Sequence, residues 1–407
     1  MKFIKLRKNN LCVENVSAFS LAKKYKTPFY CYSLKQLKDN YQKLTKAFGK
    51  VDPLICFSVK SNSNSKLLKI IKDNGLGADV VSIGELQKVL KVGFKPNKIV
   101  FSGVGKTTSE LDFAIKKKIL LINVESESEL KNIINLSKNK KTVVNVGIRL
   151  NPNVNAQTIG KISTGRMQDK FGLNFKDAIK IVDKYKNSNS IRFKCLSVHI
   201  GSQILSNVPY QKMIRVVNNF LEKVSVNFEY VDFGGGMGID YSSNKKTFDF
   251  KKLALEIYKF SKRNECKIIL EPGRSIIGDT AVLISKVIYI KESPTKDFII
   301  LDAGMNDLIR PALYNAKHMI IPAIKSSKKS KKEYDFVGPI CETSDRFLKM
   351  KKFQKLNEGE IVILKDVGAY GYVLSSNYNV RPMPKEVLVD KSKTQIISKR
   401  QSIKDLI

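Results

Sequence analysis

Residues 53–64 read PLICFSVKSNSN, an apolar run that stops at one lysine, Lys60, and a small polar turn. A lysine at the carboxyl end of an otherwise buried strand is costly unless chemistry uses its amine. Desolvation lowers the pKa of such an amine and frees it as a nucleophile, which is how Schiff-base lysines arise. Lys60 is therefore the candidate covalent nucleophile of this chain.

The same pattern recurs along the next two hundred residues. Many of the stretches between the runs are lysine-rich with helical spacing, such as SKLLKIIKDNG at 65–75. With the Lys60 run there are eight, which predicts a (β/α)8 TIM barrel whose active face lies at the carboxyl ends of the strands. An ordinary doubly wound sheet is the alternative, and it leaves the count of eight unexplained. The seven further runs occupy residues 77–86, 99–107, 120–130, 143–153, 194–204, 230–239 and 268–277.

The rest of the chain has a different sequence pattern. After about residue 277 the sequence consists of short β-rich runs without a long helix between them, which predicts a separate carboxyl-terminal β-domain. The first residues are strand-like as well and are expected to join that domain. The predicted organisation is therefore an amino-terminal segment at 1–24, a barrel at 25–277 and a β-domain at 278–407.

The composition is strongly basic. Lysine and arginine number 73 against 37 acidic residues, which gives a formal net charge of +36. Such a charge is typical of nucleic-acid-binding proteins. Here the lysines are spread through nearly every predicted helix, without an aromatic-interleaved patch or a recognisable binding module. We therefore expect no nucleic-acid partner; tight, salt-sensitive retention on DNA would overturn this expectation.

The sequence also indicates a compartment. The amino terminus has no uninterrupted apolar stretch of signal-peptide length, and no segment approaches the length of a membrane span. The six cysteines form no CxxC pair, which fits a reducing cytosol better than a disulfide framework. Since there are only two histidines, His199 and His318, a histidine-based metal centre is not expected. The sequence predicts a cytoplasmic protein with no membrane partner.

Several polar residues end the predicted barrel strands and should converge with Lys60. Asp79 and Arg149 end the second and fifth runs and are expected to support a cofactor site. Gly234, Gly235 and Gly236 follow the seventh run, where backbone N–H groups without a neighbouring Cβ can turn onto an anion. The seventh strand is a usual place for a phosphate site in this architecture.

The last predicted strands carry the acid–base candidates. Glu271 closes the eighth run, and its partner is either Arg274 or the nitrogen of a pyridine ring. A protonated ring is a strong electron sink, and Arg274 would then be free to bind a carboxylate or phosphate. His199 ends the sixth run and is interpreted as a planar ring stacked on a flat cofactor, with a buried core histidine as the alternative. Ser202 is a candidate donor to a phosphate.

Together these motifs resemble diaminopimelate decarboxylase, a fold-type III pyridoxal-phosphate-dependent enzyme with an alanine racemase-like fold. The resemblance covers nearly the whole chain in the same order. It departs in small ways, because Ser58 and Ser61 flank Lys60 where alanines are common; neither is given a role. The matching strings are CFSVKSNSN, GADVVSIGEL, STGRMQDKFG (163–172), HIGSQI, DFGGGMGIDY, EPGRS, RPALYNA (310–316), GPICETSDRF (338–347) and VGAYGYVLSSNYN (367–379).

The resemblance implies roles around the cofactor pyridoxal 5′-phosphate. Lys60 forms the imine with the cofactor aldehyde, His199 stacks on the ring, and Glu271 pairs with the pyridine nitrogen. Cys341 returns a proton to the α-carbon after carbon dioxide leaves, and it acts with Glu342 in the active site of a partner subunit of a homodimer. The other cofactor-binding positions are Asp79, Ser202, Gly234, Gly235, Gly236, Gly273, Arg274 and Tyr370. The distal end of the substrate is assigned to Arg274, Arg310, Tyr314, Glu342 and Tyr370.

The implied reaction is removal of carbon dioxide from the D-configured end of meso-2,6-diaminopimelate, which gives L-lysine in the last step of lysine biosynthesis. Ornithine or arginine decarboxylation needs an acid at the distal end and no cation, so Arg310 and Tyr314 favour the diamino dicarboxylate. The RPALY string also argues against carboxynorspermidine decarboxylase. An alanine racemase is disfavoured because Glu271 is the wrong charge for its pyridine site.

Two alternatives without catalysis remain. A barrel protein can bind pyridoxal phosphate without marked activity, but such proteins lack a β-domain with a Cys-Glu pair such as Cys341 and Glu342. A basic nucleic-acid-binding scaffold is the second alternative. The net charge supports it, but no arrangement of candidate site residues does.

Overall fold

The chain folds into two compact units. The computed structural model describes residues 3–156, 158, 160–241 and 247–407. The barrel unit consists of Lys43–Ile239 and Thr247–Ser275. The β unit consists of Met1–Gln42, Asp240–Lys246 and Ile276–Ile407.

The barrel unit contains eight parallel strands that close on themselves, because the last strand pairs with the first through Ile269–Leu54 and Leu270–Ile55. Each of the eight predicted runs contains or overlaps one of these strands, so the predicted TIM barrel is confirmed. The strands, in barrel order, are β5 (Leu54–Ser58), β6 (Gly77–Val80), β7 (Ile99–Phe101), β8 (Leu121–Val124), β9 (Val144–Leu150), β10 (Ile191–Val198), β11 (Tyr230–Asp232) and β12 (Lys267–Leu270).

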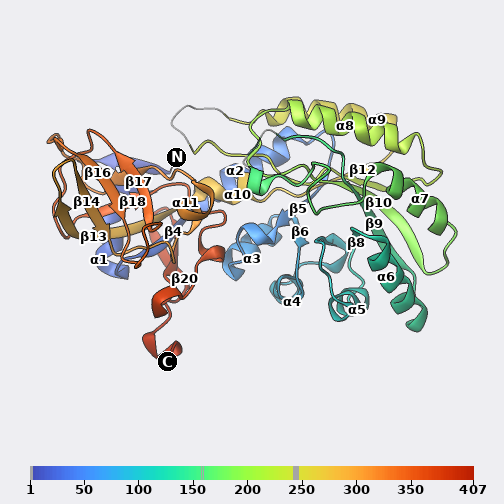
Figure 1. Ribbon diagram of the computed structural model, residues 1–407, viewed down its shortest axis with the longest axis horizontal. Helices are drawn as coiled ribbons and strands as arrows, with labels where there is room; N and C mark the ends of the chain where they lie inside the picture. The colour runs from blue at the N-terminus through green and yellow to red at the C-terminus, as the bar shows by residue number, and fades with distance from the viewer. Residues whose placement is uncertain (1–2, 157, 159, 242–246) are drawn as a thin grey trace. The chain divides into compact units, whose positions relative to one another are not determined.

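Helices follow the barrel strands and lie outside them (Figure 1). The first of these shows the local signals that define it. Asn64 caps its amino end by accepting from the backbone N–H groups of Lys66 and Leu67, and Leu67, Leu68 and Ile71 bury one face. The helices are α3 (Ser65–Asp73), α4 (Ile83–Val92), α5 (Thr108–Lys116), α6 (Glu127–Asn139), α7 (Phe175–Tyr185), α8 (Val208–Leu221), α9 (Phe250–Arg263) and α10 (Arg274–Ile277).

The β unit is built on a nine-stranded sheet in which the path β17-β16-β14-β13-β4-β19-β20 is joined by β18, which pairs with β13 and β15. Its strands are β4 (Phe29–Ser33), β13 (Ala281–Glu292), β14 (Lys296–Leu301), β15 (Ile320–Pro322), β16 (Glu333–Val337), β17 (Arg346–Met350), β18 (Ile361–Leu364), β19 (Lys385–Asp390) and β20 (Lys393–Ser398). A small sheet is formed by β1 (Ile4–Arg7), β2 (Asn10–Val13) and β3 (Val16–Ser17).

The remaining helices and helical turns differ in length, and α2 is as long as α8 and α9. The α-helices outside the barrel repeats are α1 (Ala18–Tyr25), α2 (Leu34–Ala47) and α11 (Arg310–Tyr314). The 3₁₀ turns are η1 (Val59–Ser61), η2 (Pro96–Lys98), η3 (Gly160–Ile162), η4 (Gly278–Thr280), η5 (Tyr372–Leu374), η6 (Tyr378–Val380) and η7 (Ile403–Asp405).

The grouping of residues 25–42 differs from the predicted boundary after residue 24. Strand β4 lies in the β unit, where it pairs antiparallel with β13 and parallel with β19. Its sequence, FYCYS, is buried along its whole length, like a strand of the barrel. A continuous apolar run does not reveal which of two sheets it enters, because the pattern of burial is the same in both.

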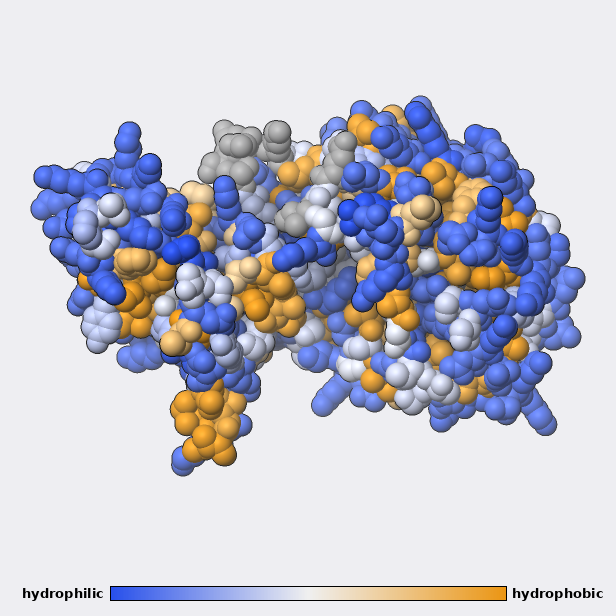
Figure 2. Space-filling model, in the orientation of Figure 1, coloured by the Kyte–Doolittle hydropathy of each residue, from blue (hydrophilic) through white to orange (hydrophobic). Residues whose placement is uncertain are grey.

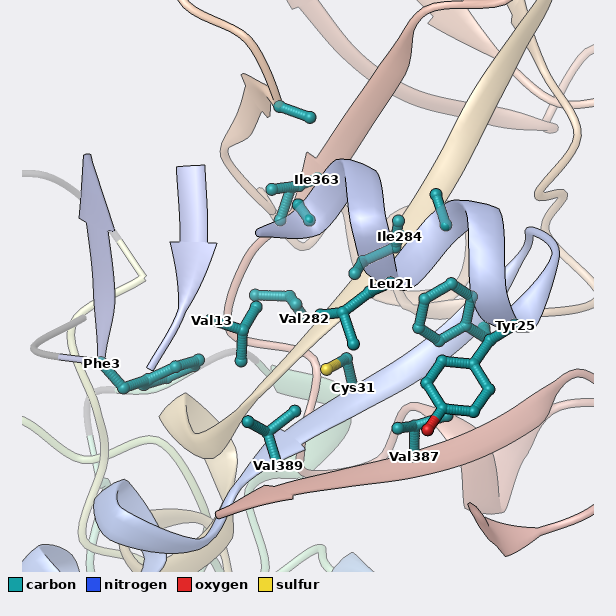
Figure 3. Close-up of a cluster of buried hydrophobic side chains, with 14 residues drawn as sticks. Phe3, Val13, Leu21, Tyr25, Cys31, Val282, Ile284, Ile363, Val387 and Val389 are labelled. Carbon is teal, nitrogen blue, oxygen red and sulfur yellow. The ribbon is translucent and has the colours of Figure 1, made fainter. Parts of the chain in front are cut away.

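Both ends of the chain share one core in the β unit (Figure 3). Val13 and Leu21 pack with Cys31 and with side chains of β13 and β19, and the buried members include Val282 and Val387. Removing these apolar side chains from water supplies the free energy that holds the amino-terminal strands on this unit.

On the face shown in Figure 2, hydrophilic residues are distributed broadly and interrupted by smaller apolar areas. Within the described ranges, no helix has the length and apolar character needed to cross a bilayer.

Candidate active site

Lys60 lies two residues past the end of β5, in the turn η1, and not in the strand itself. Its Nζ is 2.7 Å from Oδ2 of Asp79 at the end of β6. The side chain of Asp79 is fully buried, whereas that of Lys60 is 36% exposed. The sequence-based expectation of a desolvated amine is therefore corrected: Lys60 stands at the mouth of the barrel with a carboxylate beside its charge.

Ser58 was given no role from sequence, yet it joins two site residues. Its Oγ lies 2.8 Å from Oδ2 of Asp79 and 3.0 Å from the carbonyl oxygen of Glu271. Ser61 Oγ in turn donates to the carbonyl of Ser58 at 2.7 Å. A Cβ added to Gly273 would lie 2.9–3.0 Å from atoms of Ser58 and Ser61, so glycine is needed where these serines pack. The serines thus connect the turn of Lys60 to the strand ends that carry Asp79 and Glu271.

The glycine triplet after β11 forms a tight turn against His199. Gly234 and Gly236 have φ values of +63° and +92°, a region that favours glycine. The N–H of Gly235 donates to Nδ1 of His199 at 3.2 Å, and a Cβ on Gly234 would collide with the same nitrogen. This contact fixes the plane of the imidazole at the end of β10.

His199 is electrically neutral in this setting. Loss of hydration on burial, followed by the positive charges of Arg149 and Lys60, lowers the pKa of the imidazole well below its ordinary value. Because Nδ1 accepts a hydrogen bond, the proton of the neutral ring is on Nε2. A neutral planar ring held in this way is suited to stacking on an aromatic ligand.

The glycine turn permits a stability prediction. A Cβ at Gly236 would collide with the carbonyl oxygen of Gly201 and lie 3.0 Å from the hydroxyl of Tyr210. Alanine is also strained at the φ of +92° that Gly236 adopts. We expect Gly236→Ala to lower the free energy of unfolding by roughly 1–3 kcal/mol in urea titrations of the cofactor-free protein. Gly105→Ala is the matched control, because a Cβ there has open space. Equal unfolding midpoints for the two variants would contradict the predicted clash.

Glu271 and Asp232 form a buried carboxyl pair at the ends of β12 and β11. Asp232 is fully buried and Glu271 is 7% exposed, and their side chains are hydrogen-bonded to each other. Two carboxyl groups can share a hydrogen bond only when one of them keeps its proton. Burial, then the negative charges of Asp232 and Asp79, raises the pKa of Glu271 well above its ordinary value. We therefore assign the shared proton to Glu271.

Asp232 was missed in the sequence, although an acid two residues before a glycine triplet was a visible signal. Burial raises its pKa from 3.8 to about 6, while the hydrogen bond from Glu271 lowers it. Its Oδ1 accepts from the N–H of Gly234 at 2.8 Å, so Asp232 holds both the glycine turn and the carboxyl of Glu271.

The raised pKa of Asp232 predicts a pH-dependent stability. The folded-state stability that comes from keeping the Asp232 carboxyl protonated is fully present below the unfolded-state pKa of 3.8. This stability is lost as the pH rises through about 6. We expect the unfolding midpoint of the cofactor-free wild type, measured relative to Asp232→Asn, to fall between pH 4 and pH 8. Groups that do not interact with Asp232 cancel in this difference, whereas Glu271, whose pKa the charge of Asp232 raises, titrates as part of the same pair. Parallel pH curves for the two proteins would show that Asp232 does not ionise in this range.

Ser202 and Arg274 add donors beside the glycine turn. Nη2 and Nε of Arg274 lie 3.1 Å and 3.3 Å from Oγ of Ser202. Arg274 is 6% exposed and is the first residue of α10. The guanidinium of Arg274 extends toward Ser202 on the loop after β10.

Arg149 contacts residues that follow β8 and β9. It forms an ion pair with Glu125 at 2.7 Å, and its guanidinium lies 4.8 Å from the ring centroid of Phe171. Glu125 also accepts from the N–H of Gly172 at 3.0 Å. Arg149 therefore helps to hold the end of the segment 163–172 against the barrel. Thr164 of the same segment donates to the carbonyl of His199 at 3.1 Å.

The remaining candidates belong to the β unit. Arg310 begins α11 and is 4% exposed, while Tyr314 ends the helix and is partly buried. Tyr370 is partly buried and has a φ of +56°. Cys341 and Glu342 are exposed on the loop between β16 and β17. The structure brings the barrel candidates together and describes these five within their own unit.

Asp345 was not singled out as a candidate, but it shapes the loop of Cys341. Its carboxyl accepts from the backbone N–H groups of Met305 and Ile340, each at 2.7 Å. Burial raises the pKa of Asp345 to about 6. Because Ile340 directly precedes Cys341, this clamp fixes the backbone that presents the thiol.

Comparison with known proteins gives a consistent result. Residues 34–278 match the family described as pyridoxal-dependent decarboxylase, pyridoxal binding domain. The chain is 39% identical over 403 residues to a diaminopimelate decarboxylase of Aquifex aeolicus, a match that covers 98% of this chain and 95% of the relative. It is also 39% identical over 386 residues to a diaminopimelate decarboxylase of Helicobacter pylori strain J99, covering 94% and 95%.

Solved structures of diaminopimelate decarboxylases have a fold similar to that of this chain. A diaminopimelate decarboxylase from M. jannaschii has a TM-score of 0.94 at 34% identity and covers 100% of this chain and 96% of that one. The Helicobacter pylori diaminopimelate decarboxylase complexed with L-lysine has a TM-score of 0.89 at 38% identity, covering 95% and 98%. A lysine decarboxylase from Selenomonas ruminantium, at 21% identity and a TM-score of 0.80, shares the fold.

Proposed function

Because this chain belongs to the diaminopimelate decarboxylase family of pyridoxal-dependent decarboxylases, we propose that it removes carbon dioxide from the D-configured end of meso-2,6-diaminopimelate and releases L-lysine. The observation that carries the proposal is the linkage of Lys60, Asp79, Ser58 and Glu271 at one end of the barrel. This linkage places the primary amine of Lys60 and the protonated carboxyl of Glu271 at the same end of the barrel. A pyridine aldehyde needs both groups, the amine for its aldehyde and the carboxyl for its ring nitrogen.

The residues present fit pyridoxal 5′-phosphate. Oε1 of Glu271 is buried and accepts no hydrogen bond within the part of the chain that the structure describes, so a pyridine nitrogen would complete its bonding. The positive-φ glycines make a turn that a Cβ would fill, and Ser202 and Arg274 add polar groups beside it. When bound, the cofactor supplies a protonated ring that takes up the electrons left by the departing carbon dioxide.

Each barrel residue then has a defined task. Lys60 holds the cofactor covalently through its Nζ, and Asp79 balances the charge of that nitrogen. Glu271 holds the proton at the pyridine nitrogen, where the negative charge of Asp232 strengthens its retention. The neutral ring of His199 covers the cofactor face. Supporting positions for the phosphate are Ser202, Gly234, Gly235, Gly236, Gly273, Arg274 and Tyr370.

The distal end of the substrate carries both an amine and a carboxylate, so it needs an anion and a cation. Glu342 supplies the first, and Arg274 with Arg310 supplies the second, with Tyr314 and Tyr370 beside them. Cys341 donates the proton that replaces carbon dioxide. The proposal includes a cytoplasmic homodimer in which Cys341 and Glu342 act in the active site of the partner subunit.

The deciding experiment compares three substrates. Purified protein with pyridoxal 5′-phosphate is incubated separately with meso-2,6-diaminopimelate, ornithine and arginine, and released carbon dioxide is measured. We expect release from the diamino dicarboxylate alone, because ornithine and arginine offer no second carboxylate at the distal end. Release from ornithine or arginine with none from meso-2,6-diaminopimelate would replace the proposed substrate.

A further inference from the structure

His318 is a fully buried histidine between α11 and β15 with hydrogen bonds on both ring nitrogens. Its Nδ1 lies 2.7 Å from the carbonyl oxygen of Lys365. Its Nε2 lies 3.0 Å from Nη1 of Arg310. The ring therefore connects the backbone after β18 to the guanidinium at the start of α11.

The two partners determine the protonation state of the ring. A carbonyl oxygen only accepts, so Nδ1 of His318 carries a hydrogen and donates it to Lys365. A guanidinium only donates, so Nε2 must present its lone pair to Arg310. His318 is thus a neutral imidazole in a single tautomer, and it can point one lone pair at Nη1 of Arg310.

Tyr241 acts on the same guanidinium from another side. Nη1 of Arg310 donates to its hydroxyl at 3.1 Å, and the guanidinium carbon lies 4.8 Å from the ring centroid. The Tyr241 ring also packs edge-to-face against His318, with centroids 5.5 Å apart and an interplanar angle of 82°. Neither the neutral imidazole nor the phenol carries a negative charge, so both orient the arginine without neutralising it.

We infer that His318, together with Tyr241, is a positioning residue that fixes the Arg310 guanidinium for the distal carboxylate of the substrate. The inference rests on the proposed function, which assigns that carboxylate to Arg310. A guanidinium already held in one plane loses less conformational freedom when a carboxylate binds, and its remaining N–H groups keep a fixed direction. His318 and Tyr241 thereby help to select substrates with a second carboxylate.

Two ligands separate positioning from a general structural role. L-Lysine, the proposed product, carries the distal carboxylate, whereas 1,5-diaminopentane has the same chain and amines without it. A positioning role predicts that His318→Phe weakens L-lysine binding by roughly 10- to 100-fold, the range for losing one hydrogen bond to a charged group. Binding of 1,5-diaminopentane should change by less than about 2-fold, since it makes no use of Arg310.

The experiment uses the cofactor-loaded enzyme. Binding of both ligands is measured through the cofactor absorbance, and KM and kcat are measured with meso-2,6-diaminopimelate. We expect His318→Phe to raise KM far more than it lowers kcat. His318→Gln, whose amide oxygen can again accept from Arg310, should recover part of the loss. The asparagine side chain of His318→Asn reaches only the carbonyl of Lys365, so this variant should not recover the binding of L-lysine.

The outcomes are distinct. If wild-type enzyme does not decarboxylate meso-2,6-diaminopimelate, the proposed function itself fails. If it does, and His318→Phe and His318→Gln weaken L-lysine and 1,5-diaminopentane equally or weaken neither, the positioning role is overturned. In an Arg310→Ala background, His318→Phe should add no further loss of L-lysine affinity, because the group that it orients is absent.

Discussion

Lys60→Ala is expected to abolish the covalent attachment of pyridoxal 5′-phosphate and to lower decarboxylation by roughly 10⁴-fold or more, the scale seen when a nucleophile of a catalytic unit is removed. The physical reason is that Lys60 is the amine at the barrel mouth, 2.7 Å from the buried carboxylate of Asp79. The absorbance of the attached cofactor should disappear. After borohydride reduction, intact-mass measurement should show the cofactor mass on the wild type and none on the variant.

Lys69→Ala provides the control for a lysine on the helix that follows. Its side chain is 57% exposed and pairs with Asp73 at 3.6 Å across one turn of α3. Such a surface pair contributes little, so mass and activity should match the wild type. A reduced cofactor adduct that persists in Lys60→Ala would assign the covalent bond to another amine.

Cys341→Ala is expected to keep the covalent cofactor and to lose turnover by roughly 10²–10⁴-fold, which is the usual effect of removing a positioned proton donor. The thiol is exposed on a loop that Asp345 clamps through the N–H groups of Met305 and Ile340. Carbon dioxide release and cofactor mass are measured on the same sample. Cys266→Ala, which changes a partly buried thiol just before β12, should leave both unchanged. Full activity of Cys341→Ala would remove the thiol from the mechanism.

Mixing the two inactive variants tests the shared active site. If Lys60 of one subunit works with Cys341 of its partner, a mixed dimer has one intact site out of two. Random exchange of equal amounts makes half of the dimers mixed, so activity should recover to roughly a quarter of the wild-type value. No recovery after verified subunit exchange would place both residues of each site on the same chain.

The barrel and the position of its active end were readable from local pattern. Each of the eight strands is a short apolar run followed by a polar turn, and a segment of this kind is defined by its own residues. Lys60, Asp79 and Glu271 end three such runs, so their convergence followed from topology alone. The partition of the chain was harder, because β4 has the same apolar pattern whether it enters the barrel or the β unit.

Sequence alone therefore determined the barrel, its active end and the residue types available there, since strand and helix periodicities depend on neighbours in the chain. Only the tertiary structure decided which side chains meet. Closure of β12 on β5 sets Ser58 against Glu271, pairing of β11 with β12 puts Asp232 beside the same glutamate, and the β unit brings His318 to Arg310. Such contacts join residues distant in sequence, and the geometry of the packed sheets, not local pattern, selects them.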